Sequence, residues 1–449
     1  MNDTIAAIST PLGVGAIGII RVSGDDSIKI VNKIFDGVDL EKVPTHTIHY
    51  GHIIEKTSII DEVLVSVFKA PKTFTKEDVV EINSHGSIAS LNKILELLLL
   101  NGCRMAEPGE FTKRAYINGR IDLLEAEGIM DMINAKSEKA RVLAMNQVDG
   151  KLSDLIKSLR QSILEVLANI EVNIDYPEYE DILDLTIEDL KPKIDIVEEK
   201  LQELLSNSQN GKMIKEGIKV AILGKPNVGK SSLLNALLNE EKAIVTDIQG
   251  TTRDYVEGSI YLNGIPLNFI DTAGIRKTED VVEKIGVTKS LKLIEESDLI
   301  LFVLNNNEKL SKEEQELLSK IKDKKHIVIV NKSDLDKKID IDNSINPIFI
   351  STYNDSDIEK IKDRIKQLFK LEELETKDLT YISNARCIAI IKEALERVLD
   401  VKKGIENNLP IDMVEIDIKE IWNSLGKIIG ESYEDELINQ LFSQFCLGK

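Results

Sequence analysis

The sequence has little cysteine, few aromatic residues and no excess of basic charge. Its cysteines, Cys103, Cys387 and Cys446, are odd in number and far apart, so neither a disulfide framework nor a zinc site with CxxC spacing is predicted. Aromatic residues make up 4% of the chain, which disfavours a β-sandwich and favours a helix-rich architecture. The formal charge of −20 argues against a protein that coats nucleic acid by bulk electrostatics, but not against one with a local basic groove.

Long apolar runs are also missing. No stretch approaches the ~20 apolar residues of a transmembrane helix. The N-terminus carries an early acidic residue, Asp3, and no apolar segment behind basic residues, so no signal peptide is predicted. Together with the cysteine usage, these absences predict a cytoplasmic protein that makes no contact with a membrane.

The 449 residues suggest about three domains, and the sequence pattern changes along the chain. The first part mixes strands at Ala16–Val22 and Glu62–Phe68 with a helix at Ser90–Leu100. Helical spacing dominates next, then a βαβ pattern, then helical spacing again. The predicted fold class is α/β plus α, with boundaries at 1–119, 120–214, 215–372 and 373–449. Strands of a mostly parallel sheet are predicted at Lys219–Leu223, Ile265–Ile270, Leu299–Leu304, Ile327–Val330 and Pro347–Ile350.

A phosphate-binding motif, GxxxxGK(S/T), occupies Gly224–Ser231 between an apolar strand and a helix-like segment. Glycines in such a loop let backbone N–H groups face the phosphates, and the helix N-terminus adds its positive end. We expect Lys230 to reach the β- and γ-phosphates and the Ser231 hydroxyl to ligate Mg²⁺. The alternative is a glycine-rich surface loop without a ligand.

Two further motifs follow in the order typical of GTPases. Asp271–Gly274 (DTAG) ends an apolar strand, where the aspartate can hold a metal-bound water and the glycine can approach the γ-phosphate. Asn331–Asp334 (NKSD) follows another apolar run, and its aspartate can accept both N1–H and N2–H of guanine. Adenine has no donor at N1 and would leave that carboxylate unpaired, so the motif favours GTP over ATP. The alternative is an ordinary turn at the end of a strand.

The segment between these motifs is predicted to be a switch loop that closes on Mg²⁺ and the γ-phosphate. Thr252 is the expected Mg²⁺ ligand beside Ser231, with Thr251 as its competitor. Ser351–Tyr353 follows the last strand and is expected to touch the base. The residues predicted to surround GTP are Asn227, Val228, Gly229, Lys230, Ser231, Ser232, Thr246, Asp247, Ile248, Gln249, Gly250, Thr251, Thr252, Asp271, Thr272, Ala273, Gly274, Asn331, Lys332, Ser333, Asp334, Ser351, Thr352 and Tyr353.

The usual water-orienting glutamine is missing, because the position after the DTAG glycine is Ile275. Glu283 lies a few residues later in a segment that can carry it towards the water, and the alternative is a solvated helix residue. An arginine finger is not evident either. A K⁺ ion held by Asn227 and switch-loop carbonyls would supply the missing positive charge, and the alternative for Asn227 is a turn-forming residue.

These motifs, with segments outside the G domain, resemble the tRNA modification GTPase family known as MnmE or TrmE. The segments are DTIAAISTPLGVGAIGIIRVSG at Asp3–Gly24, FTKEDVVEINSHG at Phe74–Gly86 and PGEFTKRAYINGRIDLLEAE at Pro108–Glu127. The chain also ends in Phe445–Lys449, similar to the family's terminal C-x-G-K. The visible departure is the Thr352–Tyr353 pair, since the usual form after the last strand is Ser-Ala.

The resemblance implies an N-terminal α+β domain that binds folate and dimerises, and a helical domain interrupted by an inserted P-loop G domain. It implies a K⁺-stimulated GTP hydrolase that modifies the wobble uridine of certain tRNAs at C5. The added aminomethyl or carboxymethylaminomethyl group uses the one-carbon unit of 5-formyltetrahydrofolate. The implied partners are a second copy of the chain, tRNA and an FAD-dependent protein of the MnmG or GidA type, with which the chain forms a heterotetramer.

The resemblance also implies roles for single residues. Cys446 is matched to the cysteine required for the modification step, and Glu283 to the water-positioning glutamate. By residue chemistry alone, Arg21 is an ordinary surface base and Cys446 a packed small side chain. The implied folate ligands are Arg21, Glu81, Arg120 and Lys449, and the implied K⁺ ligands are Asn227, Thr246, Ile248 and Thr251.

Two other functions fit part of the sequence. A ribosome-assembly or regulatory GTPase shares the P-loop and DTAG motifs, but its usual companion is a basic RNA-binding module, and no GXXG loop lies in a basic context here. A folate one-carbon enzyme with a merely regulatory G domain is the other, and it would work without GTP turnover.

Overall fold

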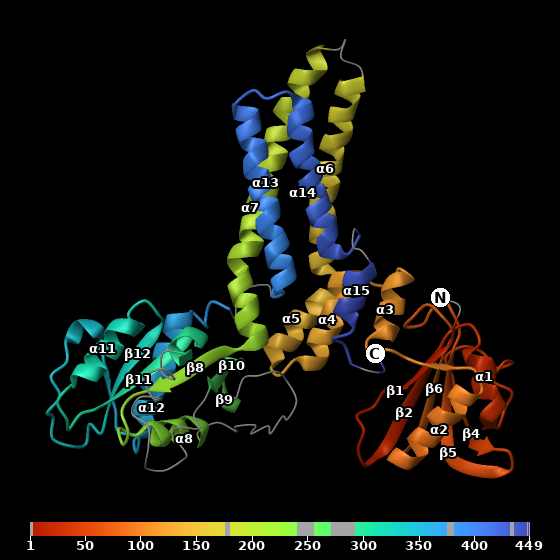
Figure 1. Cartoon of the computed structure of the whole chain (residues 1–449), viewed down its shortest axis with the longest axis horizontal. Coiled ribbons are helices and arrows are strands. Elements are labelled where there is room, and N and C mark those ends of the chain that lie inside the picture. Colours follow the sequence, from red (N-terminus) through yellow and green to blue (C-terminus); the bar gives the residue numbers. More distant parts are fainter. Residues whose placement is uncertain are drawn as a thin grey trace. The chain divides into compact units, whose positions relative to one another are not determined.

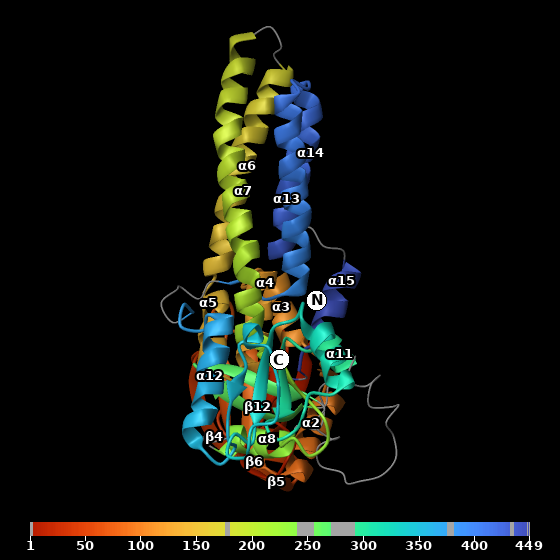
Figure 2. The same ribbon diagram turned by 90° about the vertical axis from the view of Figure 1, so that its left-hand side faces the viewer.

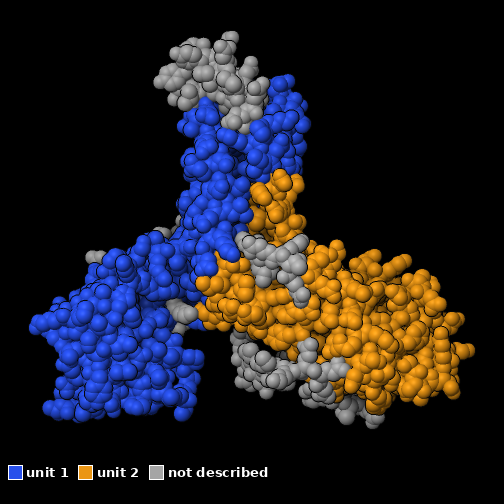
Figure 3. All heavy atoms as spheres, turned by 180° about the vertical axis from the view of Figure 1, so that it is seen from behind, with its two compact units in different colours: residues 1–130, 147–198, 390–449 blue, residues 131–146, 199–389 orange. Residues whose placement is uncertain are grey.

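The computed structural model describes residues 3–175, 180–239, 256–270, 292–374, 381–431, 435–446 and 448. The chain divides into two compact units, coloured separately in Figure 3. The first unit is formed by residues 1–130, 147–198 and 390–449, and the second by residues 131–146 and 199–389. Each unit therefore contains segments that are far apart in the sequence.

The first unit contains a seven-stranded sheet of order β3-β4-β5-β6-β2-β1-β7. Neighbouring strands are antiparallel except for β1 and β7, which are parallel. The predicted strands at 16–22 and 62–68 are present within β2 and β5, and both are longer than predicted. The strands are β1 (Ile5–Ile8), β2 (Gly15–Ser23), β3 (Phe35–Asp36), β4 (Thr47–Glu55), β5 (Ser58–Phe68), β6 (Val79–Gly86) and β7 (Arg104–Met105).

Helices cover one face of this sheet. Side chains alternate between the two faces of a strand, so Ile20 and Val22 of β2 point towards the same core as Ile82 of β6. Helices α1 (Ser27–Ile34) and α2 (Ile88–Leu100) close that core with their own buried side chains (Figure 1). The opposite face, which carries the residues that alternate with these, is available for a site.

The rest of the first unit is helical. Helix α6 packs against α14, and the apolar side chains of α6 that recur at helical spacing are buried. Figure 2 shows α6, α7, α13 and α14 running side by side. The helices that lie wholly or largely in this unit are α3 (Glu110–Ile117), α4 (Leu123–Asn134), α6 (Lys151–Asp175), α13 (Ala385–Glu406), α14 (Ile411–Ile429) and α15 (Asp435–Phe442). Helix α7 (Glu180–Glu216) is divided between the two units, and α5 (Glu138–Val148) lies largely in the second.

The second unit is built on a six-stranded sheet of order β13-β12-β11-β8-β10-β9. Every neighbouring pair is parallel except β9 and β10, so the predicted mostly parallel sheet is present. Strand β9 was not predicted. The strands are β8 (Ile218–Leu223), β9 (Val256–Leu262), β10 (Ile265–Ile270), β11 (Leu299–Asn305), β12 (His326–Asn331) and β13 (Ile348–Phe349).

This sheet is covered on both faces. Strand β11 is buried along its whole length, and its successive side chains enter two different cores. Leu301 packs in the core that contains α8 (Lys230–Asn239) and α12 (Asp355–Phe369), whereas Phe302 packs with Ile321 of α11 (Lys312–Ile321). A short 3₁₀ helix, η1, spans Asn343–Ile345. Across the ranges that the structure describes, none of the helices is both long and apolar enough to cross a membrane.

Candidate functional sites

The loop between β8 and α8 has the backbone geometry of a phosphate-binding loop. Gly224, Asn227 and Gly229 all have positive φ, of 148°, 63° and 99°. A β-carbon on Gly224 would lie 2.3 Å from the carbonyl oxygen of Val303, so only glycine fits there. The loop then leads directly into the N-terminus of α8, where Lys230 is the first helical residue.

Lys230 folds back over this loop. Its ammonium donates hydrogen bonds to the carbonyl oxygens of Gly224 at 2.6 Å and Lys225 at 2.5 Å. Burial lowers the pKa of the Lys230 ammonium. A bound phosphate would oppose that shift because its negative charge favours the protonated form. The loop thus holds the Lys230 ammonium against its own carbonyl oxygens.

The NKSD motif lies against the same loop. Asn331 ends β12 and donates from Nδ2 to the carbonyl oxygen of Val228 at 2.9 Å, while Lys332 donates from Nζ to the carbonyl oxygen of Asn227 at 2.8 Å. The Oδ1 atom of Asn331 is buried and has no hydrogen-bond partner within the described part of the chain. Side chains of the NKSD motif therefore bond to the backbone of the phosphate-binding loop, about a hundred residues earlier in the chain. Asp334 follows these contacts by two residues in the sequence.

The loop after β13 lies beside the NKSD motif. The Ser333 N–H donates to the carbonyl oxygen of Ile350 at 3.0 Å, and the Ser351 N–H donates to Asp357 at 3.0 Å. Tyr353 is 91% exposed, so its ring is not part of the packed loop. The predicted contacts of Ser351, Thr352 and Tyr353 with the base stay predictions.

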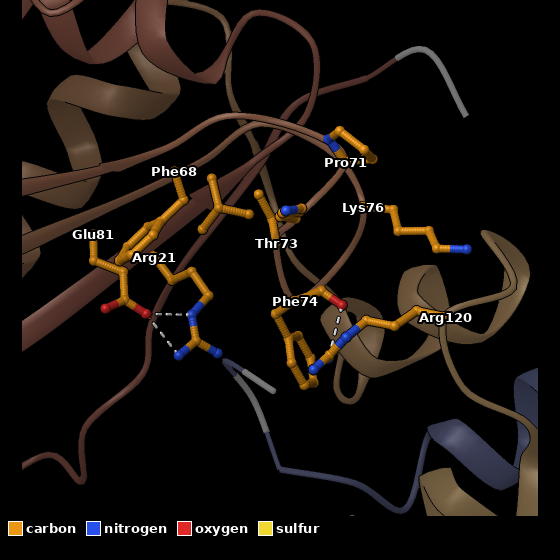
Figure 4. A pocket seen from close by; sticks show the side chains of 10 residues that line it. Arg21, Phe68, Pro71, Thr73, Phe74, Lys76, Glu81 and Arg120 are labelled. Carbon is orange, nitrogen blue, oxygen red and sulfur yellow. Dashed lines mark hydrogen bonds and ion pairs between the residues drawn. The ribbon is translucent and has the colours of Figure 1, made fainter. Parts of the chain in front are cut away.

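A second site lies on the face of the N-terminal sheet opposite α1 and α2, where Phe111 of α3 packs on Ile5 and Ala7 of β1. Here a cavity of about 590 Å³ opens between the sheet and the loop that follows β5 (Figure 4). Three of the four residues that the family resemblance assigns to folate, Arg21, Glu81 and Arg120, line it together. The lining residues are Arg21, Phe68, Pro71, Lys72, Thr73, Phe74, Lys76, Val79, Glu81 and Arg120.

The polar groups of this cavity have defined partners. Arg21 and Glu81 are cross-strand neighbours on β2 and β6, and both Nε and Nη2 of Arg21 contact Oε1 of Glu81, at 2.9 and 2.8 Å. Arg120 donates from Nη1 to the carbonyl oxygen of Phe74 at 3.1 Å, with its guanidinium 4.8 Å from the centre of the Phe74 ring. Figure 4 shows Phe74 between the two arginines. Lys76 donates to the carbonyl oxygens of Asn118 and Gly119.

The comparisons with known proteins decide the family. The family model of the GTP-binding protein TrmE N-terminus matches residues 4–120, and that of the MnmE helical domain matches residues 123–446. The chain belongs to the tRNA modification GTPase MnmE family.

The chain matches relatives of this family over its full length. The chain is 54% identical to a tRNA modification GTPase MnmE of Streptococcus thermophilus (strain CNRZ 1066), with 100% of this chain and 98% of the relative covered. It is 53% identical to one of Enterococcus faecalis (strain ATCC 700802 / V583), again with 100% and 98% covered. Among solved structures, the G domain of the T. maritima FeoB iron transporter matches 34% of this chain and 98% of that chain at 27% identity, with a TM-score of 0.25. That score is too low to compare folds.

Membership of the MnmE family confirms the prediction of a GTP hydrolase connected with tRNA modification, which uses GTP and Mg²⁺ and interacts with tRNA. Several predicted site residues lie outside the described residues. These are the switch-loop residues Thr246, Asp247, Ile248, Gln249, Gly250, Thr251 and Thr252, the DTAG residues Asp271, Thr272, Ala273 and Gly274, and Glu283 and Lys449. Of the predicted ion ligands, Asn227 and Ser231 are described.

Sequence reasoning missed a charged group next to the loop that lines the cavity. Arg114 is buried, and its guanidinium contacts Asp3, Glu77 and Glu110 at 2.8, 3.1 and 3.0 Å. Burial alone raises the pKa of Glu110, but hydrogen bonds from Arg104, the Glu107 backbone and Arg114 outweigh it, so the pKa lies below its usual value. Glu77 also accepts from Ser23 at the end of β2, which ties the cavity loop to the sheet. The family segments contain these residues, but their spacing does not show that they meet.

Proposed function

We propose that this member of the MnmE family is a K⁺-stimulated GTPase that modifies the wobble uridine of certain tRNAs at C5. It works with an FAD-dependent partner of the MnmG type in the cytoplasm. The one-carbon unit comes from 5-formyltetrahydrofolate bound in the N-terminal cavity. The observation that supports this proposal best is the meeting of Arg21, Glu81 and Arg120 in one cavity.

The chemistry of the cavity suits a folate. Phe68 and Phe74 offer apolar surface to a flat pterin ring. Arg21 occupies only Oε1 of Glu81, so Oε2 can accept pterin N–H groups as Asp334 is predicted to accept those of guanine. Arg120 presents its guanidinium on the other side of Phe74, where it can pair with a carboxylate of the glutamate tail.

Two measurements test the folate and tRNA parts of the proposal. Titration with 5-formyltetrahydrofolate should show saturable binding that Glu81→Ala weakens at least tenfold, because a charged acceptor to the pterin is lost. Asn83→Ala is the matched control. Asn83 is the next residue after Glu81 on the same face of β6, but it donates to the carbonyl oxygen of Leu64 and does not line the cavity. Mass spectrometry of tRNA nucleosides from cells lacking this protein should show wobble uridine without its C5 modification. Wobble uridine that still carries the modification in those cells would contradict the proposal.

The K⁺ part has its own test. Asn227 sits in the phosphate-binding loop with positive φ, and its carbonyl oxygen is held by Lys332. We expect GTP hydrolysis to be much faster in KCl than in NaCl, and Asn227→Ala to remove that difference. Equal rates in the two salts for the unaltered protein would contradict the K⁺ proposal without touching the folate proposal.

The same sheet face supports the homodimer proposal. Tyr50 of β4 and Leu64 of β5 are cross-strand neighbours, both exposed, and Ile48 and Ile17 on this face are exposed as well. Arg21 and Glu81 lie on this face too, so a second copy seated there would adjoin the cavity. Light scattering should find a dimer that Leu64→Glu converts to a monomer. Ile196→Glu, at another exposed apolar position, should leave the dimer intact.

A further inference from the structure

The charged side chains that line the N-terminal cavity differ in how their charges are balanced. At one end, Arg21 and Glu81 are partly buried and pair with each other. At the other, which we call the basic end, Lys72, Lys76 and Arg120 are exposed, and none of them forms an ion pair with a carboxylate among the described residues. Figure 4 shows Lys76 and Arg120 on the side away from Glu81. The basic end therefore carries unpaired positive charge in a chain whose formal charge is −20.

Two of these cations are held in place by carbonyl oxygens and still have donors to offer. The Lys76 ammonium has three N–H groups, and it donates to the carbonyl oxygens of Asn118 and Gly119 at 3.0 and 2.9 Å. Arg120 has five N–H groups, and within the described part of the chain it donates only to the carbonyl oxygen of Phe74. A carbonyl oxygen orients such a group without cancelling its charge. Both side chains can therefore bind an anion as well.

A second cavity, of about 580 Å³, adjoins the first and limits the path that an anionic ligand can take. The two cavities share Pro71 and Lys76 as lining residues. The lining of the second also includes the carboxylates of Asp25, Glu77 and Asp78, which repel a negatively charged chain. An anionic extension of a ligand in the first cavity is thereby kept at the basic end.

We propose that the cavity selects a folate that carries a poly-γ-glutamate tail, and that Lys72 and Lys76 determine this specificity. A single glutamate brings two carboxylates, and Arg120 can pair with one of them. Each further γ-linked glutamate adds one carboxylate, and the two lysines can pair with those that are added. This inference rests on the proposed binding of a folate in the cavity and names the form of folate that the site prefers.

The test is calorimetric titration of the full chain with 5-formyltetrahydrofolate that carries either one glutamate or three. The triglutamate should bind about tenfold more tightly, because it adds two carboxylates and an exposed ion pair strengthens binding roughly threefold. Lys72→Gln and Lys76→Gln should each reduce this ratio of affinities to about threefold, and the double variant should reduce it to about one. The ratio should also shrink as the ionic strength rises, since salt screens exposed charges.

Lys69→Gln is the matched control for loss of a positive charge. The Lys69 ammonium donates to the carbonyl oxygens of Glu41 and Val43 and does not line the cavity, so this variant should keep the tenfold ratio. Arg120→Gln should weaken binding of both forms and keep the ratio, because Arg120 is assigned to the first glutamate.

The outcomes separate this inference from the proposed function. Equal affinities for the two forms in the unaltered protein would overturn the inference and leave folate binding intact. A ratio that survives in the Lys72→Gln, Lys76→Gln double variant, or that is lost in Lys69→Gln, would overturn it as well, because the preference would then not come from the basic end. Failure of both forms to bind would contradict the proposed function itself, and the inference with it.

Discussion

The nucleotide-binding loop and the N-terminal cavity are built in opposite ways. The loop uses consecutive residues, 224–231, whose backbone amides and positive φ angles carry the chemistry. The cavity uses side chains from β2, β5, β6 and two loops, brought together by cross-strand pairing. A backbone site depends on a few positions where only glycine fits, whereas a side-chain site depends on the register of strands and on the charges beneath them.

The sharpest way to test this contrast is Lys230→Ala. The Lys230 ammonium lies in the phosphate-binding loop, where it can stabilise negative charge on the phosphates. Its loss should therefore lower GTP hydrolysis ~100-fold or more. Binding of 5-formyltetrahydrofolate should be unchanged, because the cavity lies in the other unit. Lys225→Ala is the control, since the Lys225 side chain pairs with Glu314 at 3.1 Å. Full tRNA modification by Lys230→Ala would favour the rival in which the G domain is merely regulatory.

A second test compares glycines of the two sites. Gly224→Ala forces a side chain into a φ of 148° and against a backbone oxygen at 2.3 Å, so we expect it to cost about 3 kcal/mol of unfolding free energy. Gly119, beside the cavity, has a φ of 65° and its nearest atom is the Lys76 ammonium at 4.0 Å. Gly119→Ala should therefore cost only about 1 kcal/mol, from the backbone alone. Urea unfolding measures both, and equal costs would remove the proposed difference between the sites.

The nucleotide-binding loop can be predicted from the sequence more fully than the cavity, because the loop is contiguous and the cavity is not. Residues 224–231 and 331–334 are contiguous motifs, and their strand and helix context follows from local hydrophobic patterns. The meeting of Arg21 with Glu81 requires the β2–β6 register, which no local pattern gives. Only the family resemblance pointed to the cavity, and it did not point to Phe74 or Lys76 as lining residues.

Two misses have different causes. Strand β9 had a local signal, because Asn263 and Gly264, with φ of 49° and 73°, form the two-residue turn that joins it to β10. Asn-Gly between apolar runs is the strongest short hairpin signal. The charged group around Arg114 had none, since its partners Asp3 and Glu77 are separated from it by 111 and 37 residues.

A third test uses low pH to weaken the ion pairs that Asp3 and Glu110 make with Arg104 and Arg114. Asp3 and Glu110 have lowered pKa values in the fold, because hydrogen bonds and charges of Arg104 and Arg114 outweigh burial. A lowered folded-state pKa stabilises the protein above the unfolded values, 3.8 for Asp and 4.5 for Glu, and this stability is lost as the pH falls through the folded pKa. Between pH 6 and pH 3, amide protection factors, which correct for the slower intrinsic exchange at low pH, should fall first in α3 and β1. Glu110→Gln should reduce this pH dependence, whereas an unaltered dependence would assign it to other carboxylates.

The smallest expected effect comes from the loop where the sequence departs from its family. Tyr353 is 91% exposed, so Tyr353→Ala should change GTP affinity less than about threefold, as surface substitutions do. Asp334→Ala, on the loop joined to the phosphate-binding loop through Asn331, should instead lower it at least tenfold, because guanine N–H groups lose their charged acceptor. Both affinities can be measured by titration with a fluorescent guanine nucleotide. A large loss in Tyr353→Ala would mean that the base draws this ring inward, and the guanine end of the site would then depend on side-chain packing as the cavity does.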